Sequence, residues 1–215
     1  MKLCLCKSRL ALVGLTLCIA FGTTGCTALV LEAAKKLRED RQTDDQITDT
    51  QIGVNFLSVL SDRDNKLLLD VNADVWELRV MLTGTVSDPK TRQELIKLAR
   101  ADKRIKKIHD EIQVVSTVEQ MRRLSARRNP DEAPKEGLSR VVEDLWIETK
   151  ISAKLIAHTD VTSVNYRWRS VRNITYLIGR AQSQTELKTV LVILNDTEGV
   201  SQVKSFVEVK PTLKS

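Results

Sequence analysis

Val80-Met81-Leu82-Thr83-Gly84 and Thr175-Tyr176-Leu177-Ile178-Gly179 are two apolar stretches that each end on a glycine, and they decide the fold. From the two glycines onward, the same apolar positions recur without a gap. The matching pairs are Leu95 with Val190, Leu98 with Ile193, Ile105 with Val200, Ile108 with Val203, Ile112 with Val207 and Val114 with Val209. A register kept over this length indicates an internal repeat, in which one structural unit occurs twice.

Ahead of the glycines, each repeat opens on a similar segment, Ile47-Thr48-Asp49-Thr50-Gln51-Ile52 or Trp146-Ile147-Glu148-Thr149-Lys150-Ile151. Apolar residues at helical spacing predict a helix in both places. They are Ile52, Phe56 and Val59 in the first repeat and Ile147, Ile151 and Leu155 in the second. A second helix is expected after the glycine of each repeat. In the first repeat its start is marked by Asp88, the expected N-cap, and by Pro89, which follows it.

In each repeat, strands are predicted between the two helices and after the second helix. Val164, Tyr166 and Trp168 alternate with polar residues, as in a half-buried strand. The order of elements in each repeat is therefore helix, two strands, helix, strand, with a slightly different hairpin length expected in the second copy. We expect an α+β fold of two tandem αββαβ modules, each a three-stranded mixed sheet with two helices on one face.

The first 26 residues follow a different pattern. Lys2, Lys7 and Arg9 precede an apolar run over 10–21, then small residues, then Cys26. This order is typical of a secretory signal, and a cysteine after a small residue resembles the acylation site of bacterial lipoproteins. We expect residues 1–25 to be a signal peptide and Cys26 to be lipidated, although Thr23 stands where such sites usually carry Leu. An uncleaved membrane-anchoring helix is the alternative.

Composition narrows the possible functions. All four cysteines lie within the first 26 residues, so the rest of the chain offers no disulfide and no cysteine-based metal site. The formal charge of +6 falls to +3, from 31 cations and 28 acids, once the signal is removed, which does not favour nucleic acid. His109 and His158 have no repeated partner residues, and phosphate loops and hydrolase motifs are missing. We therefore expect a protein without cofactor or metal, and not an enzyme.

The chain divides at its polar segments. We expect a tether over 26–43, a first module over 44–115, a linker over 116–138 and a second module over 139–211. The linker is expected to form a short helix and then a segment broken by Pro130 and Pro134. Its arginines are interpreted as a solvated helix face, with an acidic partner or anionic lipid as the alternative; they are Arg122, Arg123, Arg127 and Arg128.

Both repeats resemble the BON domain, and the whole chain resembles dual-BON lipoproteins. The shared features are the glycine that ends each second strand, the segment Gly199-Val200-Ser201-Gln202-Val203, and the opening Asp144-Leu145-Trp146-Ile147-Glu148-Thr149-Lys150. The first repeat has Arg104 at the position that corresponds to Gly199, so it lacks this glycine. Another departure is at the hairpin, where many BON domains have Gly and this chain has Leu78 and Asn173. The resemblance implies phospholipid binding and assigns Trp146 to it. Together with Thr27, which is not the Asp that retains many lipoproteins in the inner membrane, it implies a location at the outer membrane, facing the periplasm.

The helix that opens the second repeat has more apolar residues than one sheet can cover. Opposite its core stripe lies a second stripe, which includes Val142, Leu145 and Trp146, with Lys150 and Lys154 beside it. This composition is typical of a helix that enters a lipid interface. We take these five residues as the candidate binding site for anionic phospholipid.

Two other interpretations stay open. The second stripe could pack against the first module, the 117–128 helix or a partner protein, and Ile47, Val54 and Leu57 on the far side of the first helix suit packing between domains. In that case the protein would be an interaction scaffold for envelope assembly proteins, without direct lipid binding. A weaker candidate for anionic lipid is the uncovered face of the second sheet, with Arg167, Arg169 and Arg172.

Overall fold

The computed structural model describes residues 39–129 and 135–211, and Asp40–Ser215 is one compact unit of the chain. The expected signal peptide over 1–25, Cys26 and most of the tether over 26–43 lie outside the described residues. Among the described residues, the clusters of buried apolar side chains lie within this unit. The unit therefore holds its own core.

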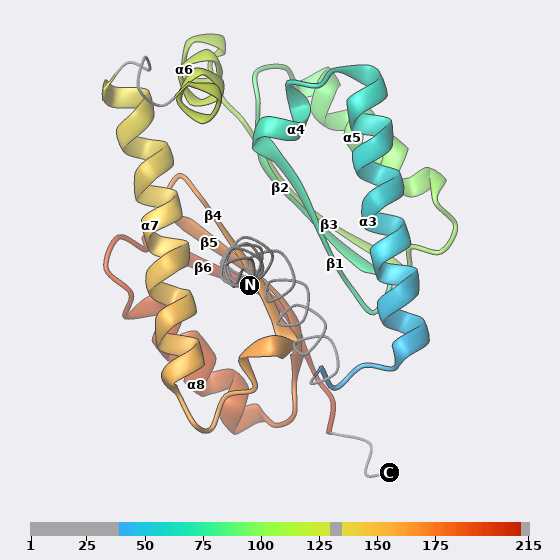
Figure 1. Ribbon diagram of the computed structural model, residues 1–215, viewed down its shortest axis with the longest axis vertical. Coiled ribbons are helices and arrows are strands. Elements are labelled where there is room, and N and C mark those ends of the chain that lie inside the picture. Colours follow the sequence, from blue (N-terminus) through green and yellow to red (C-terminus); the bar gives the residue numbers. More distant parts are fainter. Residues whose placement is uncertain (1–38, 130–134, 212–215) are drawn as a thin grey trace, which may run out of the picture. The chain divides into compact units, whose positions relative to one another are not determined.

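Two copies of the same arrangement make up the unit (Figure 1). Domain 1 contains α3 (Thr43–Arg63), α4 (Leu67–Asp70), β1 (Val71–Trp76), β2 (Arg79–Val86), α5 (Pro89–Ala101) and β3 (Lys107–Val114). The linker helix α6 (Thr117–Arg128) follows. Domain 2 contains α7 (Lys135–Ala157), the short 3-10 helix η2 (Ser163–Asn165), β4 (Tyr166–Val171), β5 (Ile174–Ala181), α8 (Gln184–Asn195) and β6 (Gln202–Val209). Helix α7 begins inside the segment that the sequence assigned to the linker.

Each domain has one mixed sheet of three strands. The orders are β1-β2-β3 and β4-β5-β6, and in both sheets the first pair is antiparallel and the second parallel. Helices α3 and α5 share a core with one face of the first sheet, and α7 and α8 do the same on the second. The predicted fold of two tandem αββαβ modules is therefore confirmed. One core position was wrong: Val59 is 39% exposed, and Leu60 takes its place at 0%.

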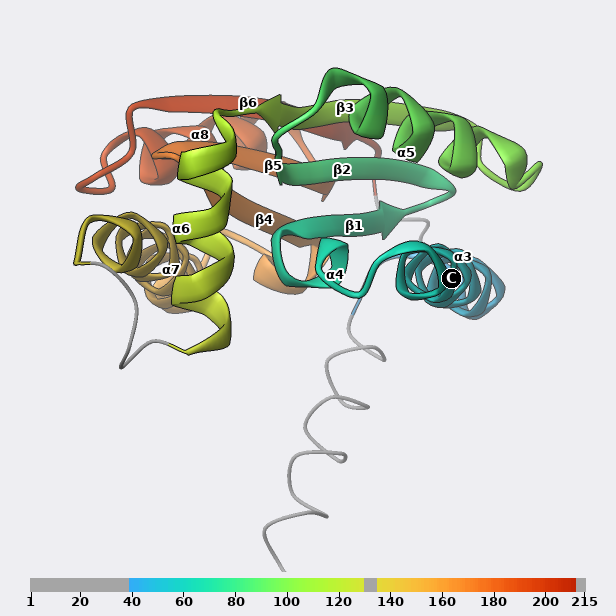
Figure 2. The same ribbon diagram turned by 90° about the horizontal axis from the view of Figure 1, so that it is seen from above.

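The two sheets face each other through the faces that their helices leave open (Figure 2). A third apolar cluster fills the space between them, with Trp76 and Met81 from domain 1 and Val171, Tyr176 and Ile178 from domain 2. The layers are thus helices, sheet, sheet, helices. The expectation that one face of the second sheet is uncovered was wrong, because the sequence pattern of one repeat does not show that the other repeat covers it.

Contacts across this interface join equivalent positions of the repeat, which are 95 residues apart. His109 stacks on Phe206 with ring centroids 4.1 Å apart, and Lys204 Nζ bonds to Glu111 at 2.7 Å. Lys204 is the equivalent of His109, and Phe206 is the equivalent of Glu111. Arg169 bonds to Asp74, its own equivalent, at 2.9 Å. These exchanged pairs indicate that a pseudo-twofold axis relates the domains.

The two hairpins are of equal length, contrary to the sequence expectation. Strands β1 and β4 have six residues each, β2 and β5 have eight, and two residues connect each pair. The difference between the repeats lies earlier, where domain 1 has α4 and domain 2 has η2. Leu78 and Asn173 both have φ of 64°, so Leu78 adopts the left-handed turn conformation despite its side chain.

A helix carboxylate holds each turn. Asp49 of α3 accepts hydrogen bonds from the backbone N–H groups of Glu77 and Leu78, and Asp144 of α7 accepts from those of Arg172 and Asn173. These bonds satisfy the part-buried N–H groups of each turn and tie the turn to the helix.

The strand-end glycines are required by close backbone approach. A Cβ at Gly84 would lie 1.9 Å from the carbonyl oxygen of Asp70, and one at Gly179 would lie 2.2 Å from that of Asn165. Both glycines also have positive φ. The repeated glycine therefore marks the point where each hairpin's first strand enters the sheet.

The linker helix is part of the domain interface. Arg123 is 0% exposed, and its guanidinium lies between Asp70 of domain 1 (3.4 Å) and Asp144 of domain 2 (3.2 Å). Arg127 pairs with Asp70 at 2.9 Å. The interpretation of this arginine cluster as a solvated face was therefore wrong for Arg123.

Candidate membrane-binding face

Helix α7 is positioned by one of its two apolar sides. Ile147, Ile151 and Leu155 are 2%, 0% and 0% exposed and join the core of domain 2. They recur at intervals of four, so they lie on one side of the helix. Trp168 of β4 donates an indole hydrogen bond to the carbonyl of Glu148 at 3.2 Å, which fixes the helix on the sheet.

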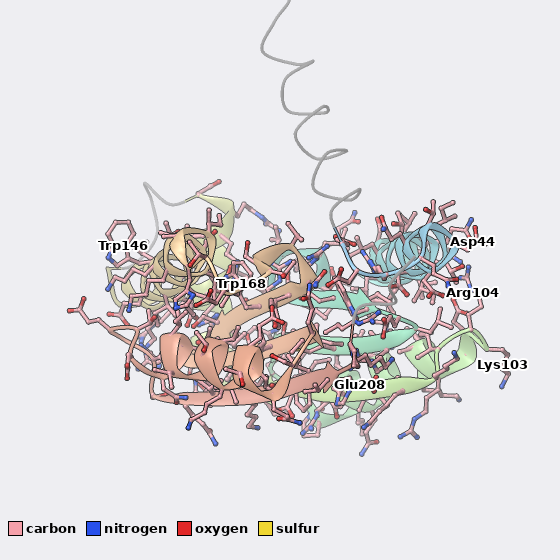
Figure 3. The ribbon with its side chains drawn as sticks, turned by 90° about the horizontal axis from the view of Figure 1, so that it is seen from below. Asp44, Lys103, Arg104, Trp146, Trp168 and Glu208 are labelled. Atoms are coloured by element: carbon pink, nitrogen blue, oxygen red, sulfur yellow. The ribbon has the colours of Figure 1, made fainter. Side chains whose placement is uncertain are left out.

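The other side of α7 is apolar and open to solvent. Val142, Leu145, Trp146 and Ile156 are 49%, 62%, 60% and 67% exposed. With 100° per residue, these positions lie on the side of the helix opposite the core stripe. Figure 3 shows Trp146 projecting outward from α7, whereas Trp168 lies inside, between helix and sheet. We call Val142, Leu145, Trp146 and Ile156 the α7 face.

The structure brings Lys150 and Lys154 to the edge of this face but engages both ammonium groups. Lys150 Nζ lies 5.9 Å from the Trp146 ring centroid and bonds to Glu198 at 2.8 Å. Lys154 Nζ donates to the Asp196 carbonyl at 3.0 Å and to the Thr197 hydroxyl at 3.1 Å. The hydrogen bond from Lys150 lowers the pKa of Glu198. Because the Lys150–Glu198 pair is at the surface, it is weak, and an anionic headgroup can compete with it.

The weaker candidates are held at the domain interface. Arg169 pairs with Asp74, and Arg167 lies over the Trp76 ring at 5.2 Å. Arg172 is exposed, pairs with Glu119 at 3.0 Å and donates to Gln113. The structure thus separates these arginines from the α7 face and gives them internal partners.

If the second apolar side of α7 packed inside the molecule, its residues would be buried, but they are exposed. Helix α6 lies beside α7, where Arg140 bonds to Glu119 at 3.2 Å, yet Trp146 keeps 60% of its surface open. The far side of α3 is equally open: Ile47, Val54 and Leu57 are 52%, 59% and 43% exposed. Packing between the domains therefore uses the sheets and α6, and not the far sides of α3 and α7.

Sequence reasoning missed Glu198 as the partner of Lys150. The two residues are 48 positions apart, and only the fold shows that the α8–β6 loop reaches α7. Gly199 gives a partial signal, because a Cβ there would lie 3.1 Å from Ile147 and the loop is therefore closely packed on the helix.

The described residues contain neither a membrane-spanning helix nor a metal site. No described helix is long and apolar enough to cross a membrane. Within 39–129 and 135–211, no group of three or more His, Cys, Asp or Glu residues could hold a metal ion.

Comparison with known proteins identifies the class and then the family. The tandem modules, each with a glycine-ended hairpin, match the model of the BON domain over residues 43–116 and 143–211. The chain therefore belongs to the BON family and carries two BON domains. Membership suggests an envelope-associated role in phospholipid binding or in protein interactions.

Relatives add little about function. An uncharacterized protein of Anaplasma centrale, encoded in the gshII 5′ region, is 35% identical over 140 residues, which are 65% of this chain and 82% of that protein. Among solved structures, CdsD, a structural protein of the type III secretion system of Chlamydia trachomatis, matches with 15% identity and a TM-score of 0.30. That match covers 72% of this chain and 93% of the solved chain. A structure of the CdsD C-terminal domain matches with a TM-score of 0.28.

Proposed function

We propose that this chain is an envelope-maintenance lipoprotein, of the DolP type among dual-BON proteins, which binds anionic phospholipid through the α7 face of domain 2. Acylated Cys26 would hold it at the outer membrane on the periplasmic side. The proposal involves no catalysed reaction and no nucleic acid. The observation that carries it is the exposed row of Val142, Leu145, Trp146 and Ile156 on a helix whose opposite side is anchored in the core.

The physical case rests on what a bilayer offers to such a face. Trp and aliphatic side chains gain free energy when they leave water for the interfacial region, and Trp prefers that region. Burying an exposed Trp contributes about 2–3 kcal/mol. Lys150 lies beside the ring, where a headgroup phosphate can replace Glu198 as its partner. A lipid anchor then makes a weak site effective, because it holds the face close to the membrane.

Vesicle co-sedimentation of residues 27–215 tests the proposal. Zwitterionic vesicles are compared with anionic ones, and Trp146→Glu is compared with Ile47→Glu. Ile47 lies on the outer side of α3, the corresponding helix of domain 1, and is 52% exposed, so the control introduces the same charge at an exposed apolar residue outside the α7 face. We expect selective binding to anionic vesicles, a loss of roughly 30-fold or more with Trp146→Glu, and a change below about threefold with Ile47→Glu. Equal effects of the two substitutions, in folded proteins, would remove the α7 face from the proposal.

One observation favours a protein-interaction role as the second candidate. The far side of α3 presents Ile47, Val54 and Leu57 to solvent, and binding lipid through domain 2 does not use them. Exposed apolar patches of this kind often mark protein interfaces. A photo-crosslinker at Val54, in cells, is expected to capture a protein of the envelope assembly machinery if the chain is a scaffold. Capture of lipid alone from both Val54 and Trp146 would argue against this role.

A further inference from the structure

The two domains differ most in charge at one place, the second helix and the loop that follows it. Residues 90–107 of domain 1 contain eight cations and two acids, a net charge of +6. The equivalent residues 185–202 of domain 2 contain one cation and three acids, a net charge of −2. The backbone elements are the same in both, so the fold itself does not require these cations.

Five of the cations form a surface at one end of domain 1, from the last turns of α5 through the loop to the start of β3. We call it the basic end, and its members are Lys97, Arg100, Lys103, Lys106 and Lys107. All five are exposed, and within residues 39–129 and 135–211 none of them has an ion pair. In domain 2 their positions are taken by Val192, Asn195, Glu198, Ser201 and Gln202.

The acids of this segment do not neutralise the basic end. Glu94 pairs with Arg63 of α3, and Asp102 pairs with Arg104 at 2.5 Å. Glu208 interacts electrostatically with Lys107 alone among the five. The five like charges therefore repel one another more than they are neutralised, which is unfavourable for the folded chain unless an anionic partner is met. Their spread over a helix end, a loop and a strand suits a surface whose negative charges can rearrange to meet them. A bilayer with anionic headgroups has that property, because its lipids diffuse laterally.

The basic end lies on the side of the unit opposite the α7 face. Figure 3 shows Trp146 at one side and Lys103 and Arg104 at the other, and Figure 1 places α7 and the α5–β3 loop in the same relation. One flat bilayer cannot contact both at the same time. We infer that the basic end of domain 1 is a second, electrostatic membrane-binding surface, and that the protein can bridge two apposed anionic bilayers. The bridging rests on the proposed function of the α7 face, whereas the affinity of the basic end does not.

The test separates binding from bridging in folded residues 27–215. Two populations of anionic vesicles, labelled with donor and acceptor dyes, report clustering by energy transfer, and co-sedimentation reports binding. The triple variant Lys97→Gln, Arg100→Gln, Lys103→Gln is compared with a matched triple variant at exposed cations elsewhere, Lys66→Gln, Arg128→Gln, Lys188→Gln.

We expect the wild-type and matched proteins to cluster the vesicles, and clustering to weaken with salt. The basic-end triple is expected to stay bound through the α7 face but to require roughly a hundredfold more protein for clustering, at about fivefold for each lost cation. Trp146→Glu is expected to show the roughly 30-fold or greater loss of binding given above, to keep only the weaker, salt-sensitive binding through the basic end, and to lose clustering.

Each contrary outcome has a separate meaning. The inference is overturned if the basic-end triple variant clusters vesicles at the concentration that the wild-type protein needs. It is also overturned if the wild-type protein binds vesicles but does not cluster them. Both outcomes leave the α7 proposal standing. Binding and clustering by Trp146→Glu at wild-type levels overturns the α7 proposal instead. If no variant binds anionic vesicles, both are overturned, and an acidic protein becomes the partner to seek for the basic end.

Discussion

Domain 1 and domain 2 have the same strands, turns and helix order, and they differ where their surfaces meet something else. Domain 2 presents Trp146 on its first helix, whereas the equivalent position in domain 1, 95 residues earlier, is Gln51. Domain 1 presents a basic end where domain 2 is weakly acidic. Most positions inside the cores, by contrast, keep their apolar character in both copies. The repeat therefore supplies a common scaffold, and each copy is specialised on its outer surface.

The interface between the domains shows the same division. At one pair of exchanged positions a histidine stacks on a phenylalanine, and at the symmetric pair a lysine bonds to a glutamate. One pseudo-symmetric contact is therefore largely apolar and the other is ionic. Substitutions at these contacts, at the linker and at the strand-end glycines can show how far the two halves are energetically alike.

The largest effect is expected at the linker. Arg123→Met leaves Asp70 and Asp144 buried at 1% and 2% exposure without the cation between them. Burial alone would lower the pKa of Arg123, but these two carboxylates raise it, which reflects their attraction to the charged form. Removing one member of a buried ion network costs roughly 3–5 kcal/mol. Denaturant unfolding is expected to show this loss, and Arg128→Met, at an exposed position of the same helix, is expected to change stability by less than about 0.5 kcal/mol.

A smaller change with Arg123→Met, under about 1 kcal/mol, would mean that Arg127 and the hairpin N–H groups suffice for the two carboxylates. The domains would then be held together by the apolar cluster between the sheets. The linker would contribute geometry and little free energy.

The next largest loss of stability is expected at the strand-end glycines. Gly84→Ala and Gly179→Ala place a Cβ against backbone at 1.9 Å and 2.2 Å and require a left-handed conformation of alanine. We expect each to lower the free energy of unfolding by about 2–4 kcal/mol, with Gly84 the more sensitive. Thermal unfolding of the two variants measures the difference directly.

Gly53 provides the control, because it lies within α3 and a Cβ there meets its nearest neighbour at 3.9 Å. Gly53→Ala is expected to stabilise the helix by about 0.5–1 kcal/mol. If Gly84→Ala were as harmless, the close approach of β2 to Asp70 would be wrong.

How much the sequence revealed depends on the range of the interactions. The repeat, the helices and the strand-end glycines followed from local patterns, and Asp88 does cap α5 by accepting hydrogen bonds from Lys90 and Thr91. The exposed second stripe of α7 also followed from the 100° spacing of its residues. Its lipid-binding role stays a prediction.

Long-range pairing was beyond the sequence. Arg123 looks like its exposed neighbours in a basic helix, and its partners are 53 and 21 residues away. Arg167 and Arg169 alternate with core residues as any solvent-facing positions do, and only the facing sheet of domain 1 makes them internal. Leu78 was a doubtful turn residue because the carboxylate of Asp49, which holds that turn, comes from another element.

A pH-dependent effect is expected next, at the histidine contact. Burial, together with the cations Lys107 and Arg79, lowers the pKa of His109 to about 4, from about 6.5 in an unfolded chain. The unfolded chain therefore takes up a proton as the pH falls below 6.5, while the folded protein does not until about pH 4. Stability is lost across this window, by about 2 kcal/mol at its acid end.

The variant His109→Gln removes this contribution and keeps a polar side chain at the position. Unfolding at pH 7.5 and at pH 4.5 is expected to show a larger difference for the wild type than for the variant. The carboxylates titrate in both proteins and cancel in the comparison. Equal pH dependence in the two would show that His109 is hydrated in the folded state.

The smallest effect is expected at the symmetric contact, between Lys204 and Glu111. Their side chains are 38% and 18% exposed, so water screens the pair, although the hydrogen bond that Lys204 donates to Glu111 raises the pKa of Lys204. A double-mutant cycle with Lys204→Met and Glu111→Gln is expected to give a coupling free energy of about 0.5–1 kcal/mol, reduced by salt. A coupling well above 2 kcal/mol, insensitive to salt, would contradict the expected screening. The same pseudo-twofold position holds a stacked ring pair on one side and an ion pair on the other. The ionic contact is the weaker of the two. We therefore expect the interface to open first at that side when the domains separate.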